Sequence, residues 1–186
     1  MEAFFIANLD LRNPDSFDSA LIKKIERYVR NSYEYRKFCL YIRDEKGLVK
    51  CDYFKDIFSD DQDEITTEIH HNLFTLYDIV EIVGLKMIFD YTTAEKVLLP
   101  IDIAKKVIEL HLENKVSVIV LSKSIHEAVH GGEYKYDQTH AVGNWKDFVK
   151  EYCEYISADK ITKIKNQYDV EIKLEEYYEK EEGKKE

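Results

Sequence analysis

Four of the chain's six histidines occur as two pairs, and imidazole can bind a metal ion or move a proton at neutral pH. The first pair is His70 and His71, which end an alternating stretch and would point to opposite faces of a strand. The second pair is His126 and His130, whose i, i+4 spacing places both rings on one face of a helix. Three of these rings could together bind one metal ion and leave one histidine over.

The context of the two pairs resembles the HNH nucleases, the ββα-metal family of phage and bacterial endonucleases. In that family one strand carries the His-His pair, and a second strand leads through a turn into a short helix with a further histidine. Here residues 65–71 and 116–121 would be the strands, and 122–129 the turn and helix. The resemblance implies an α+β fold with a ββα-metal core, a helical insertion between its strands, and additional N- and C-terminal helices.

The resemblance also implies a role for each matching residue. His70, His126 and His130 look like the metal ligands, and His71 looks like the general base that activates water. The middle position of the motif is usually an asparagine that orients this base, and it falls on Ser117. A serine hydroxyl can still form a hydrogen bond but reaches less far. Ser117 is the candidate for the orienting role, and Asn114 or another residue is the alternative.

Glu68 precedes His70 by two residues and should share its strand face. It could position a metal-bound water or hold a ring, and a solvated carboxylate is an equal alternative. A lone His-x-x-x-His on a helix is likewise more often a surface pair than a metal site. The upstream histidine pair and the strand-turn-helix context favour the metal site here.

Three neutral imidazoles would leave open positions on the ion for water and a phosphate oxygen, as in a catalytic site. We expect one divalent metal ion, with Zn²⁺, Ni²⁺ or Mn²⁺ favoured by the nitrogen ligands and Mg²⁺ as the alternative. The expected function is metal-dependent hydrolysis of phosphodiester bonds in DNA. RNA is an alternative substrate. The other alternative is a catalytically inactive HNH-like module for metal binding or assembly.

The hydrophobic pattern divides the chain into four regions. They are 1–62, an N-terminal helix plus hairpin; 63–135, the core with its helical insertion at 72–116; 136–174, C-terminal helices packed on the core; and 175–186, a charged tail expected to be disordered.

Individual elements follow from their own local signals. The helix of the first region should span 16–30, and its hairpin should have strands at 38–43 and 48–54. In the insertion, Thr75 and Asp78 form a capping box for a helix that Gly84 should end. A second helix should follow at 103–113, and Asn144 and Asp159 should cap two more.

The formal net charge of −10 should oppose binding to nucleic acid. Residues 21–43 are the exception, because seven basic side chains there outnumber two acidic ones. The candidate phosphate contacts are Lys23, Lys24, Arg27, Arg30, Arg36 and Lys37. The alternative is an ordinary solvated helix face. A protein partner that delivers the nucleic acid would also reconcile the net charge with nuclease activity.

The composition fits a compact intracellular protein. Apolar residues make up 45% of the chain, and there are only 6 glycines and 2 prolines, which predicts a helix-rich fold with few loops. The chain has no run of 18 apolar residues and no signal-like N-terminus, so we expect a cytoplasmic location in a bacterial or phage-infected cell, without membrane binding. Three scattered cysteines fit a reducing compartment. No pattern indicates the oligomeric state.

Overall fold

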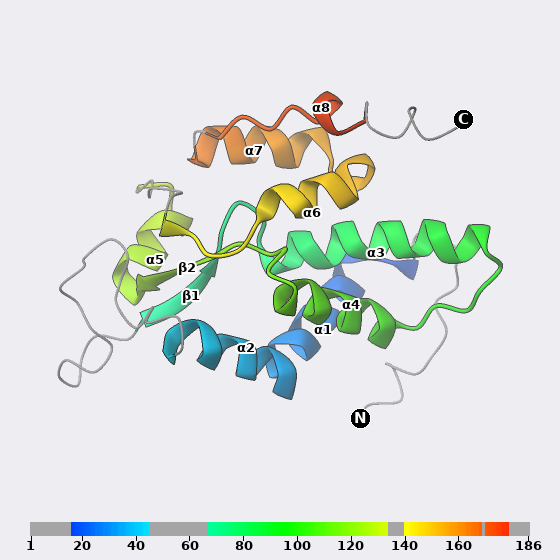
Figure 1. Ribbon diagram of the computed structural model, residues 1–186, viewed down its shortest axis with the longest axis horizontal. Helices are drawn as coiled ribbons and strands as arrows, with labels where there is room; N and C mark the ends of the chain where they lie inside the picture. The colour runs from blue at the N-terminus through cyan, green and yellow to red at the C-terminus, as the bar shows by residue number, and fades with distance from the viewer. Residues whose placement is uncertain (1–15, 45–66, 134–139, 169, 179–186) are drawn as a thin grey trace.

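The computed structural model describes residues 16–44, 67–133, 140–168 and 170–178, and for Asp44, His130 and Tyr178 it describes the backbone only. The fold is α+β and mostly helical, as expected (Figure 1). Its elements are α1 (Ser19–Asn31), α2 (Tyr33–Asp44), β1 (Thr67–His71), α3 (Leu76–Thr93), α4 (Pro100–Leu112), β2 (Val118–Ser122), α5 (Lys123–His130), α6 (Trp145–Tyr152), the 3-10 helix η4 (Cys153–Tyr155), α7 (Ala158–Tyr168) and α8 (Glu175–Tyr178).

The two strands form an antiparallel pair in the interior. His70 lies opposite Ile119, and His71 lies opposite Val118. All five residues of β2 are buried, and Val118 also forms an isolated bridge with Val142. A strand buried on both faces needs a continuous apolar run, which the sequence of β2 supplies. Both expected strands and the helical insertion between them are confirmed.

Helices pack around this sheet in layers. α1 contacts α3 and α4, and the three helices bury apolar side chains such as Ile25, Val80 and Val107 against one another. In Figure 1, α1 and α2 lie at the bottom, α3, α4 and the sheet lie in the middle, and α6, α7 and α8 lie above. Lys160 of α7 forms ion pairs with Asp78 and Glu81 of α3, which fixes the upper layer to the middle one.

The insertion begins as predicted and then departs from the prediction. The Thr75 hydroxyl accepts a hydrogen bond from the Asp78 amide at 3.1 Å, and the Asp78 carboxylate accepts one from the Thr75 amide at 3.0 Å. Gly84 does not end the helix, which continues to Thr93. A Cβ at Gly84 would lie 2.1 Å from Cζ of Phe17. The glycine is therefore needed for close packing of Phe17, and its role as a C-cap was predicted wrongly.

Residues 38–43 form part of α2, so the predicted first strand of the hairpin is wrong. Tyr35, Phe38 and Ile42 are buried, and their i, i+3, i+7 spacing matches one face of a helix. Arg43 near the end of α2 donates a hydrogen bond to the Thr67 carbonyl at 2.6 Å, which joins this helix to the start of β1. The predicted second strand, 48–54, lies outside the described residues.

The C-terminal region is helical as expected. The Asn144 side chain caps α6 by accepting a hydrogen bond from the Lys146 amide, and α7 follows after η4. α7 begins at Ala158, so Asp159 lies inside its first turn and the prediction that Asp159 caps the helix is wrong. The Ser157 hydroxyl accepts the hydrogen bond from the Lys160 amide instead, at 3.4 Å. Residues 175–178 form the short helix α8, so that part of the expected disordered tail is ordered. Residues 179–186 lie outside the described part of the chain. The division of the chain into four regions stays a prediction.

Candidate functional site: the histidine cluster and the α2–α4 groove

His71 packs in the interior against His111 of α4. The two Nε2 atoms are 3.1 Å apart, and both residues are buried. The His111 ring also lies edge-on to Tyr35 and Phe38 of α2, with a centroid separation of 5.2 Å in each case. His71 is thus enclosed by side chains from α2 and α4.

The hydrogen bonds of His111 fix the tautomer of each neutral ring. Its Nδ1 lies 2.7 Å from the Val107 carbonyl oxygen, which can only accept, so Nδ1 carries the proton. Nε2 of His111 is then an acceptor. Nε2 of His71 must therefore donate to it, and both rings form a hydrogen bond while uncharged.

Burial lowers the pKa of both histidines. Desolvation is the main cause of the low pKa of His71, which lies well below its ordinary value, and the neighbouring His111 lowers it further. For His111, burial lowers the pKa to about 4, against the effect of its hydrogen bond to Val107. The pair is neutral at physiological pH, and its arrangement suits packing in the core rather than exchange of protons with bulk water.

His70 and His126 lie close to each other and take no part in the hydrogen bond between His71 and His111. Their rings are edge-to-face with centroids 4.9 Å apart, and His70 Nε2 lies 3.4 Å from the Tyr168 hydroxyl. His126 Nδ1 donates to the Glu68 carboxylate at 2.6 Å. Glu68 therefore holds a ring, which is one of the roles expected for it.

Ser117 is buried and forms its described hydrogen bonds with Asn72. The Asn72 side-chain amide donates to the Ser117 hydroxyl at 3.1 Å, and the Asn72 backbone amide donates to the Ser117 carbonyl at 2.8 Å. These contacts join the end of β1 to the start of β2. His71 instead bonds to His111, which the sequence analysis had treated as an ordinary helix-face residue.

The predicted metal ligands are only partly brought together. His70 and His126 are neighbours, whereas the side chain of His130 lies outside the described part of the structure. Among the described residues, no group of three or more His, Cys, Asp or Glu side chains could hold a metal ion. A cleft of about 80 Å³ borders His70, His71, His126 and Arg30. Metal binding by this cluster stays a prediction.

The predicted phosphate-contacting residues lie on α1 and α2. All six are exposed: Lys23, Lys24, Arg27, Arg30, Arg36 and Lys37. Arg30 is ion-paired with Glu26 at 2.8 Å, and the Lys37 ammonium lies 5.0 Å from the centre of the Tyr33 ring. The structure thus places these residues on one pair of helices, and their binding to nucleic acid stays a prediction.

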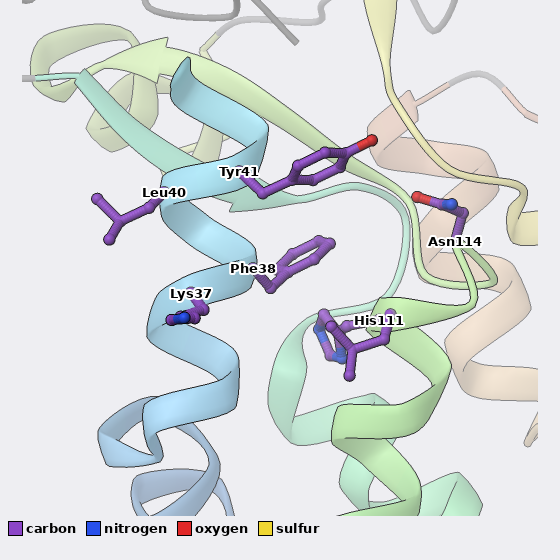
Figure 2. A pocket seen from close by; sticks show the side chains of 7 residues that line it. Lys37, Phe38, Leu40, Tyr41, His111 and Asn114 are labelled. Atoms are coloured by element: carbon purple, nitrogen blue, oxygen red, sulfur yellow. The ribbon is translucent and has the colours of Figure 1, made fainter. Parts of the chain in front are cut away.

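A groove of about 490 Å³ lies between α2 and the end of α4. Figure 2 shows Phe38 and Tyr41 pointing from α2 toward His111 and Asn114. Apolar side chains beside this groove are open to solvent: Leu40 is 57% exposed and Leu112 is 56% exposed. The groove gives the surface next to the buried histidine pair an apolar character.

This surface was not predicted, because residues 38–43 were assigned to a strand. On a helix, Tyr33, Lys37, Leu40 and Tyr41 follow i, i+4, i+7, i+8 spacing and share one face. That spacing was the available signal. A helical reading of residues 33–44 would have predicted two apolar faces, only one of which fits against the core.

Comparison with known proteins identifies the family. A model of the bacteriophage G278-like virion protein family matches residues 2–185. No curated protein and no solved structure was found to match the chain. None of the described helices is both long and apolar enough to cross a membrane.

The family match overturns the resemblance to the HNH nucleases and the functions inferred from it. The predicted DNA-cutting activity and the assignment as a metal-dependent enzyme are wrong, because the matching family is one of virion proteins. Two strands followed by a helix with suitably spaced histidines are too simple a pattern to identify a nuclease. The expected phage association is confirmed, while a cytoplasmic location stays a prediction. The chain belongs to the bacteriophage G278-like virion protein family.

Proposed function

We propose that this virion protein is a structural component that helps to build the phage particle through protein–protein contacts. The observation that carries the proposal is the exposed apolar face of α2 beside the α2–α4 groove. Leu40, Tyr41 and Leu112 are all exposed there, although the same helix already buries Tyr35, Phe38 and Ile42 in the core. A helix with a second apolar face in solvent is typical of a surface that binds a partner.

The histidine cluster supports the same proposal. His71 and His111 form a hydrogen bond with each other inside the core, so the two rings serve packing. His126 and Glu68 join α5 to β1, and Asn72 and Ser117 join the ends of the two strands. These contacts connect β1 to α4, α5 and β2, so they serve the packing of the interior.

The proposal is tested by interrupting the gene in the phage and supplying the protein from a plasmid. Without the protein, we expect fewer intact particles in electron micrographs, and wild-type protein should restore their number. A Leu40→Asp, Tyr41→Asp variant should restore it poorly, whereas Phe89→Asp, a change at an exposed aromatic residue of α3, should restore it well. Normal particle number, morphology and infectivity without the protein would contradict the proposal.

A further inference from the structure

The solvent face of α1 is basic. The helix buries its apolar side, which includes Ile25 and Val29, and it contacts α3 and α4. Its exposed residues include four basic side chains and no acidic one. The four recur at i, i+1, i+4 and i+7 spacing, which places them on one side of a helix. They form the α1 basic face, which consists of Lys23, Lys24, Arg27 and Arg30.

The acidic neighbours of this face neutralise only part of its charge. Glu26 is half-buried and forms an ion pair with Arg30 at 2.8 Å. Asp18 lies before the helix and caps it by accepting a hydrogen bond from the Leu21 amide at 2.8 Å. Within the described residues, no ion pair involves Lys23 or Arg27. The α1 basic face therefore keeps an excess of positive charge.

The net charge of −10 does not cancel this local excess. Residues 19–44, which form α1 and α2, contain seven basic and three acidic side chains, so the acidic excess lies in the rest of the chain. At physiological ionic strength the Debye length is about 8 Å, and exposed charges farther away than this are largely screened. A polyanion at the α1 basic face is thus attracted by the nearby positive charges more than it is repelled by the distant negative ones.

The regular spacing of these charges fits the backbone of duplex DNA. From Lys23 to Arg30 the helix rises by about 10 Å. Each strand of duplex DNA carries about three phosphates in that distance. The exposed residues of α1 include no aromatic side chain, so the face lacks the stacking platform typical of proteins that bind single strands. A row of cations without such a platform favours a duplex over a single strand.

We propose that the α1 basic face binds the phosphate backbone of duplex DNA, without reading the base sequence and without cutting the strand. The four residues do not line the α2–α4 groove, so this surface is distinct from the one that carries the proposed function. The protein then contacts other virion proteins through the groove and a nucleic acid held in the particle through α1.

Binding of the full chain to a short, fluorescently labelled duplex of random sequence tests the inference. Fluorescence anisotropy at low salt should give a Kd of about 10 µM or below. The Lys23→Gln, Lys24→Gln, Arg27→Gln variant should bind at least about tenfold more weakly, and its affinity should depend less steeply on salt, with a log–log slope smaller by about 3. Lys23→Arg, Lys24→Arg keeps both charges and should bind as wild type does.

A matched control separates this face from the general effect of charge. Lys96→Gln, Lys150→Gln, Lys163→Gln removes the same number of charges at exposed lysines outside α1. This control should bind the duplex as wild type does. All the substituted side chains are exposed, and circular dichroism should show that every variant stays folded. A single strand of the same length should bind more weakly than the duplex.

Three results would overturn the inference. The first is a wild-type protein that fails to bind duplex DNA at low salt at a concentration of about 100 µM. The second is an equal loss of affinity in the α1 variant and its matched control. The third is a single strand that binds as tightly as the duplex or more tightly. None of these results decides the proposed function, which depends on whether particles need the protein and its Leu40 and Tyr41 surface.

Discussion

The buried contact between His71 and His111 shows how a motif that suggests catalysis can serve packing. Each ring forms a hydrogen bond while neutral, and the aromatic rings of Tyr35 and Phe38 cover His111. A buried polar group with a partner costs little, whereas the charged form of either ring would lose its solvation. The folded protein therefore favours the neutral form of both histidines.

Stability should consequently depend on pH below neutrality. In the unfolded chain His111 binds a proton near pH 6.5, whereas in the folded chain it does so only near pH 4. Between these values the unfolded state binds more protons, so the free energy of unfolding falls as pH falls from about 6.5 to about 4. The contribution of His111 is about 3 kcal/mol, and the low pKa of His71 acts in the same direction.

Urea denaturation at a series of pH values measures this effect. The His111→Gln variant is the control, because glutamine can accept the hydrogen bond from His71 and does not titrate. Its free energy of unfolding should change less steeply than that of wild type across the same pH range. Equal slopes for the two proteins would show that His111 does not cause the pH dependence.

The buried and half-exposed histidines should differ in their effect on stability. His71→Ala leaves a cavity and removes the donor to His111, so it should lower the free energy of unfolding by about 2–4 kcal/mol. His126→Ala removes a partly exposed contact with Glu68 and should cost less than about 1 kcal/mol. Denaturant midpoints measure both changes. Equal losses would contradict the structural distinction between the two residues.

At the scale of the element, residues 76–93 show why one helix end was misjudged. The capping box of Thr75 and Asp78 is a local signal, so the start of α3 could be predicted from the sequence. Gly84 is usually a sign of a helix end, but here it accommodates Phe17, which is 67 residues away in the chain. A contact between distant residues is not visible in local patterns.

Gly84→Ala should therefore destabilise the protein, although alanine is the better helix former. The new Cβ would lie 2.1 Å from Cζ of Phe17, so the ring must move, at a cost of about 1–3 kcal/mol. Gly131→Ala is the matched control, because its Cβ would have ordinary contacts of 3.5 Å. Thermal denaturation compares them. A destabilisation that persists when Phe17→Leu is added would mean that another contact opposes the alanine.

The second half of α2 was predicted as a strand for a different reason. Residues 38–42 are a short continuous apolar run that also suits a strand, and only the longer spacing from Tyr35 to Ile42 identifies the helix. Because of this error, the exposed face with Leu40 and Tyr41 was not predicted, although the proposed function rests on that surface. The histidine motif was found from the sequence, but its partner His111 was not, because α4 is brought beside β1 only by the fold.

At the scale of the whole molecule, the protein is mostly helical (Figure 1), and residues 19–44 hold seven basic and three acidic side chains in a chain whose formal net charge is −10.

The central claim is that this chain is a structural component of the phage particle. The most direct measurement is quantitative mass spectrometry of particles purified on a density gradient and washed with salt, beside the lysate from which they came. The account predicts many copies per particle, at a ratio to the other virion proteins that the washes do not change. A chain that is abundant in the lysate but lost from washed particles would contradict it.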